Sequence, residues 1–213
     1  RQIPRAGIVH RLDKETSGLM VVARTLQAQT HLVKQLQDRS VKRHYLAVAH
    51  GIINADGTVD APIGRHPKDR VKMAVVRNGK DSITHYHVIE RFNAYTLIEC
   101  RLETGRTHQI RVHMAHIKHP LAADPVYGIP AKMDTASEVQ MALDDLARQA
   151  LHARKLSLVH PATGKTMTWK APVPFDLEQL IGTLRAAVGL SQDAPDDDDE
   201  EDDPDCELIY VRE

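Results

Sequence analysis

The chain has 213 residues, 42% of them hydrophobic, which suits one domain of ordinary size with its own core. Its apolar runs, such as residues 18–23, are far shorter than the roughly 20 residues that cross a bilayer, so we expect no membrane partner. Cys100 and Cys206 lie far apart. They predict neither a disulfide framework nor a paired-cysteine metal site, and they favour a reducing, cytoplasmic setting.

Charge is distributed unevenly along the chain. The 28 basic and 29 acidic residues nearly cancel, but residues 193–213 hold 12 acidic residues and only one basic residue, Arg212. The remainder therefore has 17 acidic and 27 basic residues, a formal charge of +10. Such a body indicates either a polyanionic partner or merely a soluble basic surface.

Hydrophobic periodicity predicts the elements of the first half of the chain in order. Residues 18–23 predict a buried strand, and residues 26–39 predict an amphipathic helix. A strand is expected over residues 43–49, before Gly51, and a turn over residues 54–57.

The second half continues with more strands than helices. Strands are expected over residues 84–92 and 95–102, which pair in a hairpin, and over residues 150–159 and 166–171. Helices are expected over residues 107–116 and 175–188. Because strands and helices do not alternate strictly, we expect an α+β fold with a mixed, largely antiparallel sheet flanked by helices.

The domain organisation follows from composition. We expect one domain over residues 1–192 and a disordered acidic tail over residues 193–213, in which only residues 208–211 could dock as a short strand. The chain starts at Arg1 without a leader, as a fragment of a longer protein would.

A dense polar segment lies between two apolar stretches near the start of the chain, and its members are His10, Arg11, Asp13, Lys14, Thr16 and Ser17. Polar groups crowded between strands line a cleft or form a tight turn. Asp13 is accordingly either a functional carboxylate or an Asx-type turn residue that binds nearby amides.

Two later segments are candidates for binding. Tyr45 enters a strand, where it is either a stacking platform for a base or an ordinary strand aromatic. Arg106, His108 and Arg111 follow Gly105 at the predicted start of a helix. This arrangement can hold a phosphate or a catalytic carboxylate, or it can be a solvated basic face.

A third pattern, His113, His116 and His119, has spacing that suggests a metal site. No carboxylate or cysteine stands at matching spacing, so we expect no metal.

Together these segments resemble a known family. His-Arg-Leu-Asp-Lys-Glu-Thr-Ser-Gly-Leu over residues 10–19 is similar to the signature of the RluA-type pseudouridine synthases, and the segments around Tyr45, Gly105–Arg111 and Asp124–Gly128 resemble its later motifs. The most similar subgroup comprises the D-type enzymes, which modify RNA of the large ribosomal subunit. Many of these carry a small N-terminal S4-like RNA-binding domain, which we expect to be missing from this chain.

The resemblance implies a pseudouridine synthase catalytic fold and a role for each motif residue. Asp13 would be the catalytic aspartate, with Arg111 paired to it, and Tyr45 would stack on the target uracil and take part in removing the proton from C5. The residues expected to contact RNA or the flipped base are His10, Arg11, Arg106, His108 and Ile110.

The implied reaction converts uridine to pseudouridine in large-subunit (23S) ribosomal RNA. The N1–C1′ bond breaks, the uracil rotates, and C1′ joins C5, so the reaction is an isomerisation that needs no cofactor. The base must first be flipped out of the folded RNA. An ionised carboxylate in a dry pocket needs a neighbouring cation, which is the reason to expect Arg111 beside Asp13. The carboxylate would act either as a nucleophile or as the base of a glycal route.

Other functions stay open at this stage. The chain could be an RNA-binding or ribosome-assembly protein with the same fold and no activity, or a histidine-dependent metal hydrolase. We expect a monomer whose RNA binding weakens steeply with salt. If the acidic tail covers the basic cleft, its deletion should tighten RNA binding.

Overall fold

The computed structural model describes residues 3–129, 137–189 and 209–211. Its strands are β1 Ser17–Met20, β2 Lys42–His50, β3 Gly57–Asp60, β4 Ile63–Arg65, β5 Met73–Val75, β6 Ile83–Arg91, β7 Tyr95–Leu102, β8 Leu151–Val159, β9 Thr166–Lys170 and β10 Ile209–Val211. Its helices are the 3-10 turn η1 Pro4–Gly7 and the α-helices α1 Leu26–Gln37, α2 Gln109–His116, α3 Ser137–Leu146 and α4 Phe175–Ala187.

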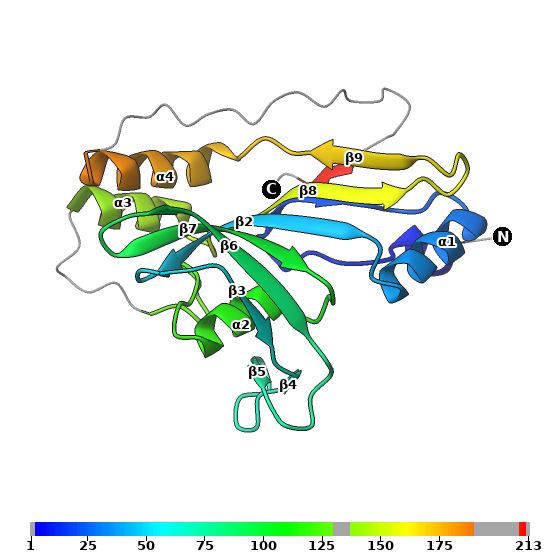
Figure 1. The fold of residues 1–213 in the computed structure, drawn as a ribbon, viewed down its shortest axis with the longest axis horizontal. Coiled ribbons are helices and arrows are strands. Elements are labelled where there is room, and N and C mark those ends of the chain that lie inside the picture. Colours follow the sequence, from blue (N-terminus) through cyan, green and yellow to red (C-terminus); the bar gives the residue numbers. More distant parts are fainter. Residues whose placement is uncertain (1–2, 130–136, 190–208, 212–213) are drawn as a thin grey trace.

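One twisted sheet organises the described part of the chain (Figure 1). Its strands follow the order β10-β1-β8-β2-β7-β6-β3, and β9 pairs with the far half of β8. The β1–β8 pair is parallel and the other pairs of this sheet are antiparallel. The expected α+β fold with a mixed, largely antiparallel sheet is therefore confirmed, and β4 and β5 form a separate two-stranded ribbon.

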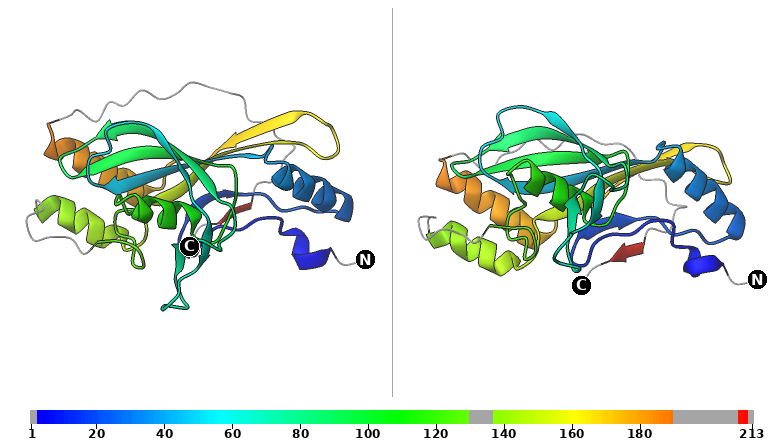
Figure 2. Two further views of the ribbon diagram at one scale, coloured as in Figure 1. Left: turned by 60° about the horizontal axis from the view of Figure 1, so that its bottom comes forward. Right: turned by 90° about the horizontal axis from the view of Figure 1, so that it is seen from below.

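Strand β2 lies at the centre of the sheet and is buried on both faces. Leu46 and Val48 belong to the core that α3 and α4 complete, whereas Tyr45, Ala47 and Ala49 belong to the core that α2 covers. This division follows from the two-residue repeat of a strand, which sends alternate side chains to opposite faces. Figures 1 and 2 show α3 and α4 together at one end of the sheet, with α1 at the other end.

The helices are built by local signals in the sequence. Thr25 caps α1, where its hydroxyl accepts a hydrogen bond from the backbone N–H of Ala28 at 3.1 Å. Helix α3 buries four apolar residues at helical spacing, Val139, Ala142, Leu143 and Leu146. These side chains pack with α4 onto the face of the sheet away from α2.

Most predicted elements are present, with bounds that differ by at most three residues. The prediction omitted α3 and the short strands β3, β4 and β5, and residues 209–211 do form a strand beside β1. The expected disorder of residues 193–205 lies outside the described residues. Among those described, no helix is long and apolar enough to cross a membrane.

Candidate active site

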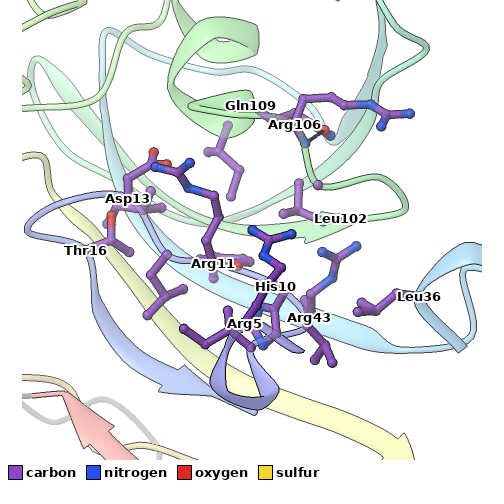
Figure 3. A pocket seen from close by; sticks show the side chains of 17 residues that line it. Arg5, His10, Arg11, Asp13, Thr16, Leu36, Arg43, Leu102, Arg106 and Gln109 are labelled. Atoms are coloured by element: carbon purple, nitrogen blue, oxygen red, sulfur yellow. Dashed lines mark hydrogen bonds between the residues drawn. The ribbon is translucent and has the colours of Figure 1, made fainter. Parts of the chain in front are cut away.

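A pocket of about 290 Å³ opens between the segment before β1, the first residues of β2 and the start of α2 (Figure 3). Its volume is at the lower end of small-molecule sites. Six of the predicted site residues line it, namely His10, Arg11, Asp13, Tyr45, Arg106 and Ile110. The fold therefore gathers three segments that are widely separated in the sequence around one cavity.

The loop that carries Asp13 is held by the side chain of Gln149, which lies just before β8. Gln149 is 2% exposed, and its amide donates to the carbonyl of Lys14 at 2.7 Å and to the hydroxyl of Thr16 at 3.0 Å. The backbone N–H of Thr16 donates to the carbonyl of Asp13 at 3.0 Å. Within the described chain, no backbone amide binds the Asp13 carboxylate, so that group is not used as an Asx-turn acceptor and is free for other contacts.

The next two motif residues fasten the loop to the same strand. Ser17 bonds through its hydroxyl to Nδ1 of His152 at 2.9 Å. Gly18 has φ +108°, and a Cβ placed on it would lie 2.2 Å from the carbonyl oxygen of Ala153. The close parallel approach of β1 to β8 thus requires glycine at this position.

Arg111 joins two carboxylates in the interior. Its Nε and Nη2 donate to Asp124 at 2.7 and 2.8 Å, and its Nη1 lies 3.6 Å from Oδ2 of Asp13. The side chains of Arg111 and Asp124 are 4% and 0% exposed, whereas that of Asp13 is 14% exposed. Arg111 is therefore fixed in place by Asp124, and its Nη1 group faces the Asp13 carboxylate.

The pKa values of this pair reflect their mutual burial. Burial alone acts against charge on both groups, but the hydrogen bonds from Arg111 hold the pKa of Asp124 below its usual value. Burial likewise acts to lower the pKa of Arg111, and the contacts with Asp124, aided by the charge of Asp13, raise it. Both side chains stay ionised at neutral pH.

Tyr127 supports the guanidinium from its face. The guanidinium carbon of Arg111 lies 5.2 Å from the centre of the Tyr127 ring, a cation–π contact. The Tyr127 hydroxyl accepts from the backbone N–H of Met73 at 2.9 Å and bonds to Nδ1 of His108 at 2.8 Å. His108 thus contacts Tyr127, which supports Arg111, and it is not among the residues that line the pocket.

Tyr45 forms a wall of the pocket beside Ile110. Both side chains are buried, at 6% and 4% exposure. Burial raises the pKa of Tyr45, with the Asp13 charge acting in the same direction and the Arg43 charge against it. The phenol is accordingly protonated at neutral pH, and it offers a ring and a hydroxyl rather than a phenolate.

His10 is tied to the backbone. Its Nε2 accepts from the N–H of Val21 at 3.0 Å, which fixes the proton on Nδ1. Burial and then the charge of Arg43 lower the pKa of His10 to about 4. His10 is thus neutral at physiological pH, and its Nε2 is occupied by the hydrogen bond to the backbone.

The two predicted arginines differ in how firmly they are held. Arg106 donates through Nε to the carbonyl of Asp81 at 3.0 Å, and its backbone N–H donates to the side chain of Gln109 at 3.0 Å. Arg11 is exposed, and Figure 3 shows its side chain reaching toward the end of the pocket that holds Asp13. Arg11 is the more available of the two for a ligand.

Two of the three histidines whose spacing suggested a metal site, His113 and His119, bond to different parts of the chain. His113 is buried and bonds to the hydroxyl of Thr84 and the carbonyl of Ala61, both at 2.9 Å. His119 bonds to the carbonyl of His50 at 2.8 Å. No group of three or more potential metal ligands is clustered among the residues described.

Comparison with known proteins places the chain in a family. The family profile described as RNA pseudouridylate synthase matches residues 1–116, more than half of the chain. The chain belongs to this family. It is 56% identical, over all of its length, to a protein of Neisseria meningitidis serogroup B named Ribosomal large subunit pseudouridine synthase D, of which 60% is covered. A protein of the same name from Escherichia coli K12 is 55% identical over 91% of the chain and 60% of the relative.

Solved structures of the family agree with the fold. Human RNA Pseudouridylate Synthase Domain Containing 1 superposes with a TM-score of 0.66 at 28% identity, covering 84% of this chain and 71% of the human one. Human RNA Pseudouridylate Synthase Domain Containing 4 gives a TM-score of 0.67 at 27% identity, with 84% and 75% covered. The chain spans about 60% of the length of the two bacterial relatives named above.

Reasoning from the sequence missed the residues that support this site. Asp124 stands in a segment that the resemblance had singled out, but nothing there predicted it as the main partner of Arg111. Gln149 and His152 lie at the start of a predicted strand, and their only sequence signal is that they are polar residues beside a buried run. Such contacts depend on which strands become neighbours.

Proposed function

We propose that the protein isomerises specific uridines of large-subunit (23S) ribosomal RNA to pseudouridine, with Asp13 as the catalytic residue. The observation that carries the proposal is a carboxylate at the pocket, 3.6 Å from a guanidinium that Asp124 holds in position. The family membership and the names of the bacterial relatives support the reaction and the class of RNA.

The pocket suits a flipped base. The cavity of about 290 Å³ has apolar walls that include Ile110 and the ring of Tyr45, on which a uracil can stack. Arg11 stands exposed beside the same cavity and can hold the displaced strand through a phosphate. Stacking and phosphate contacts of this kind offset the few kcal/mol that flipping costs.

Asp13 would act on the sugar once the base is bound. It attacks C1′ or removes the proton at C2′, and either step requires an ionised carboxylate. The neighbouring Arg111 favours that form and limits the positions that the carboxylate can take.

Tyr45 is better suited to stacking than to acting as a strong base. Because burial raises its pKa, deprotonation of its hydroxyl is unfavourable. In this proposal the hydroxyl hydrogen-bonds the rotated uracil near C5 and relays the proton only as the C5 bond is made.

We further infer that the protein works as a cytoplasmic monomer on RNA. Cys100, a free thiol, is buried in the core, in keeping with a reducing compartment. The basic body of the chain, with its formal charge of +10 before residue 193, supports a nucleic-acid partner.

The test is pseudouridine formation in an unmodified large-subunit RNA transcript by the wild-type chain and by Asp13→Asn. We expect the substitution to lower the rate by a factor on the order of 10³ or more, because it removes the ionised oxygen. RNA affinity should stay within about twofold, because Asn keeps the shape of the side chain. The matched control is Glu15→Gln, which removes an exposed carboxylate of the same loop and should leave the rate unchanged.

Two results would reject the proposal. If Asp13→Asn retains the wild-type rate, the chemistry belongs to another group. If the wild-type chain binds the transcript and forms no pseudouridine, even when joined to the preceding region of a relative, the chain is an RNA-binding protein with the synthase fold.

A further inference from the structure

Arg43 is a buried guanidinium that the reaction described above does not use. Arg43 lies two residues before Tyr45 in β2, lines the same pocket, and is 7% exposed. Figure 3 shows its side chain, with that of Arg5, at the opposite end of the pocket from Asp13.

This guanidinium has no partner among the residues that the structure describes. No carboxylate or carbonyl oxygen there pairs with it, and its buried Nε makes no hydrogen bond. Burial acts against its charge and lowers the pKa of Arg43, yet arginine stays protonated in proteins. An uncompensated buried cation is costly to a fold, so its presence calls for a compensating anion.

The surroundings of Arg43 supply further donors and no available acceptor. Nδ1 of His10, which carries the proton, is also buried without a partner. Asp13, the carboxylate that lines the pocket, is already paired with Arg111. Gly105 leaves room for the guanidinium, since a Cβ added there would lie 2.6 Å from Nη1 of Arg43.

We propose that Arg43 binds a phosphate of the RNA backbone, on a nucleotide adjacent to the uridine that enters the pocket beside Asp13. This inference rests on the proposed function, because it assumes that RNA occupies the pocket. The planar fork of a guanidinium matches two phosphate oxygens, and binding would complete the hydrogen bonds that the free protein leaves open. Arg43 thereby anchors the strand at one end of the pocket while the base is processed at the other.

The first test is thermal unfolding of Arg43→Met without RNA. A methionine fills similar space and removes the uncompensated charge, so we expect an unfolding midpoint equal to or above that of the wild type. A structural arginine would behave in the opposite way, because its loss would lower the midpoint. Failure of Arg43→Met to fold would likewise reject the proposal.

The second test is the affinity of the same proteins for the large-subunit RNA transcript across a range of salt concentrations. We expect Arg43→Met to bind about tenfold more weakly and to reduce the slope of log Kd against log salt by about 0.7 to 0.9, the contribution of one phosphate contact. Arg43→Lys keeps the charge and should recover most of the slope. Arg101→Met, which removes an exposed arginine of β7, is the matched control and should keep the wild-type slope.

A smaller change examines the same site without removing the arginine. Gly105→Ala places a methyl group against the Arg43 guanidinium and should weaken RNA binding severalfold. An Arg43→Met protein with the wild-type affinity and slope would overturn the phosphate site.

The outcome is separable from that of the proposed function. Pseudouridine formation by the wild type together with an unchanged slope in Arg43→Met would reject the phosphate site alone. A reduced slope in Arg43→Met, together with a wild type that makes no pseudouridine, would keep the phosphate site and reject the reaction.

Discussion

Arg111 binds two carboxylates unequally, and the two acids therefore differ in their contacts and in their access to the pocket. Asp124 accepts two short hydrogen bonds from Arg111 and is fully buried, whereas Asp13 has a longer contact and reaches the pocket. Asp124 also accepts from the backbone N–H groups of Val126 and Tyr127. In the proposed reaction Asp124 is therefore a positioning residue, which holds Arg111 while Asp13 meets the substrate.

Replacing Asp124 should damage both stability and activity. Asp124→Asn removes the buried charge that compensates Arg111 and leaves the longer contact to Asp13 as the one ion pair of that guanidinium among the described residues, so we expect a loss of about 3–5 kcal/mol in the free energy of unfolding. The displaced guanidinium should also lower the rate of pseudouridine formation by about 10²-fold in the protein that remains folded. Urea denaturation and single-turnover assays measure the two effects.

A second arginine–aspartate pair provides the comparison. Arg148 binds Asp176 with similar distances, 2.7 and 2.9 Å, but the Asp176 side chain is 36% exposed. Asp176→Asn should cost about 1 kcal/mol and spare the activity. Equal losses of stability in both variants would show that burial is not what makes the Asp124 pair important.

At the scale of elements, the parallel contact between β1 and β8 positions the Asp13 loop. Three consecutive residues of β1 and the loop before it, Thr16, Ser17 and Gly18, each meet the segment from Gln149 to Ala153. Strand packing therefore explains the Thr-Ser-Gly portion of the motif. The residues of the motif before Thr16 include several that line the pocket.

Gly18→Ala tests this contact. The added methyl would collide with the carbonyl of Ala153 in a backbone conformation that alanine disfavours, so β1 must move away from β8. We expect a loss of more than about 3 kcal/mol in stability and a matching loss of activity. Gly164→Ala has a similarly positive φ, +70°, but open space around it, and should cost only about 1 kcal/mol without affecting the rate. A Gly18→Ala protein as stable as Gly164→Ala would show that β1 is not held by close approach.

The sequence predicted elements better than the contacts between them. The hairpin of β6 and β7 was predicted, but three residues, 92–94, connect its strands where two were expected. Helix α3 has apolar residues at helical spacing, and the sequence analysis did not predict it. The start of α2 was placed at residue 107, but His108 takes a left-handed conformation and the helix begins at Gln109. A positive φ outside glycine depends on tertiary contacts, which periodicity does not contain.

The candidate site was predicted in part. The motifs identified Asp13, Tyr45 and Arg111, and the fold brings the first two to one pocket with the third behind them. Asp124 and Gln149 escaped prediction because their roles arise from strand and loop neighbours that are distant in sequence.

At the scale of the whole molecule, buried histidines make the folded state sensitive to acid. Burial is the largest cause of a lowered pKa in five described histidines, His10, His50, His108, His113 and His152. For His10 and His152 the folded value falls to about 4, against an ordinary 6.5. Between those pH values the unfolded chain binds protons that the folded chain excludes, so stability rises with pH across this window and falls on acidification.

His152 permits a direct measurement of this effect, because it is fully buried and bonded to Ser17. With a folded pKa of about 4, it should remove on the order of 2 kcal/mol of stability between pH 7 and pH 5, a fall of about 4–8 °C in Tm. His152→Gln should be less stable at pH 7, because it loses packing and the fitted hydrogen bond. Its Tm should nevertheless change less with pH than that of the wild type, since no proton is taken up at this position on unfolding. His116→Gln, which alters an exposed histidine of α2, should keep the wild-type pH dependence. Parallel Tm curves for His152→Gln and the wild type from pH 7 to pH 5 would show that the acid sensitivity arises elsewhere among the buried histidines.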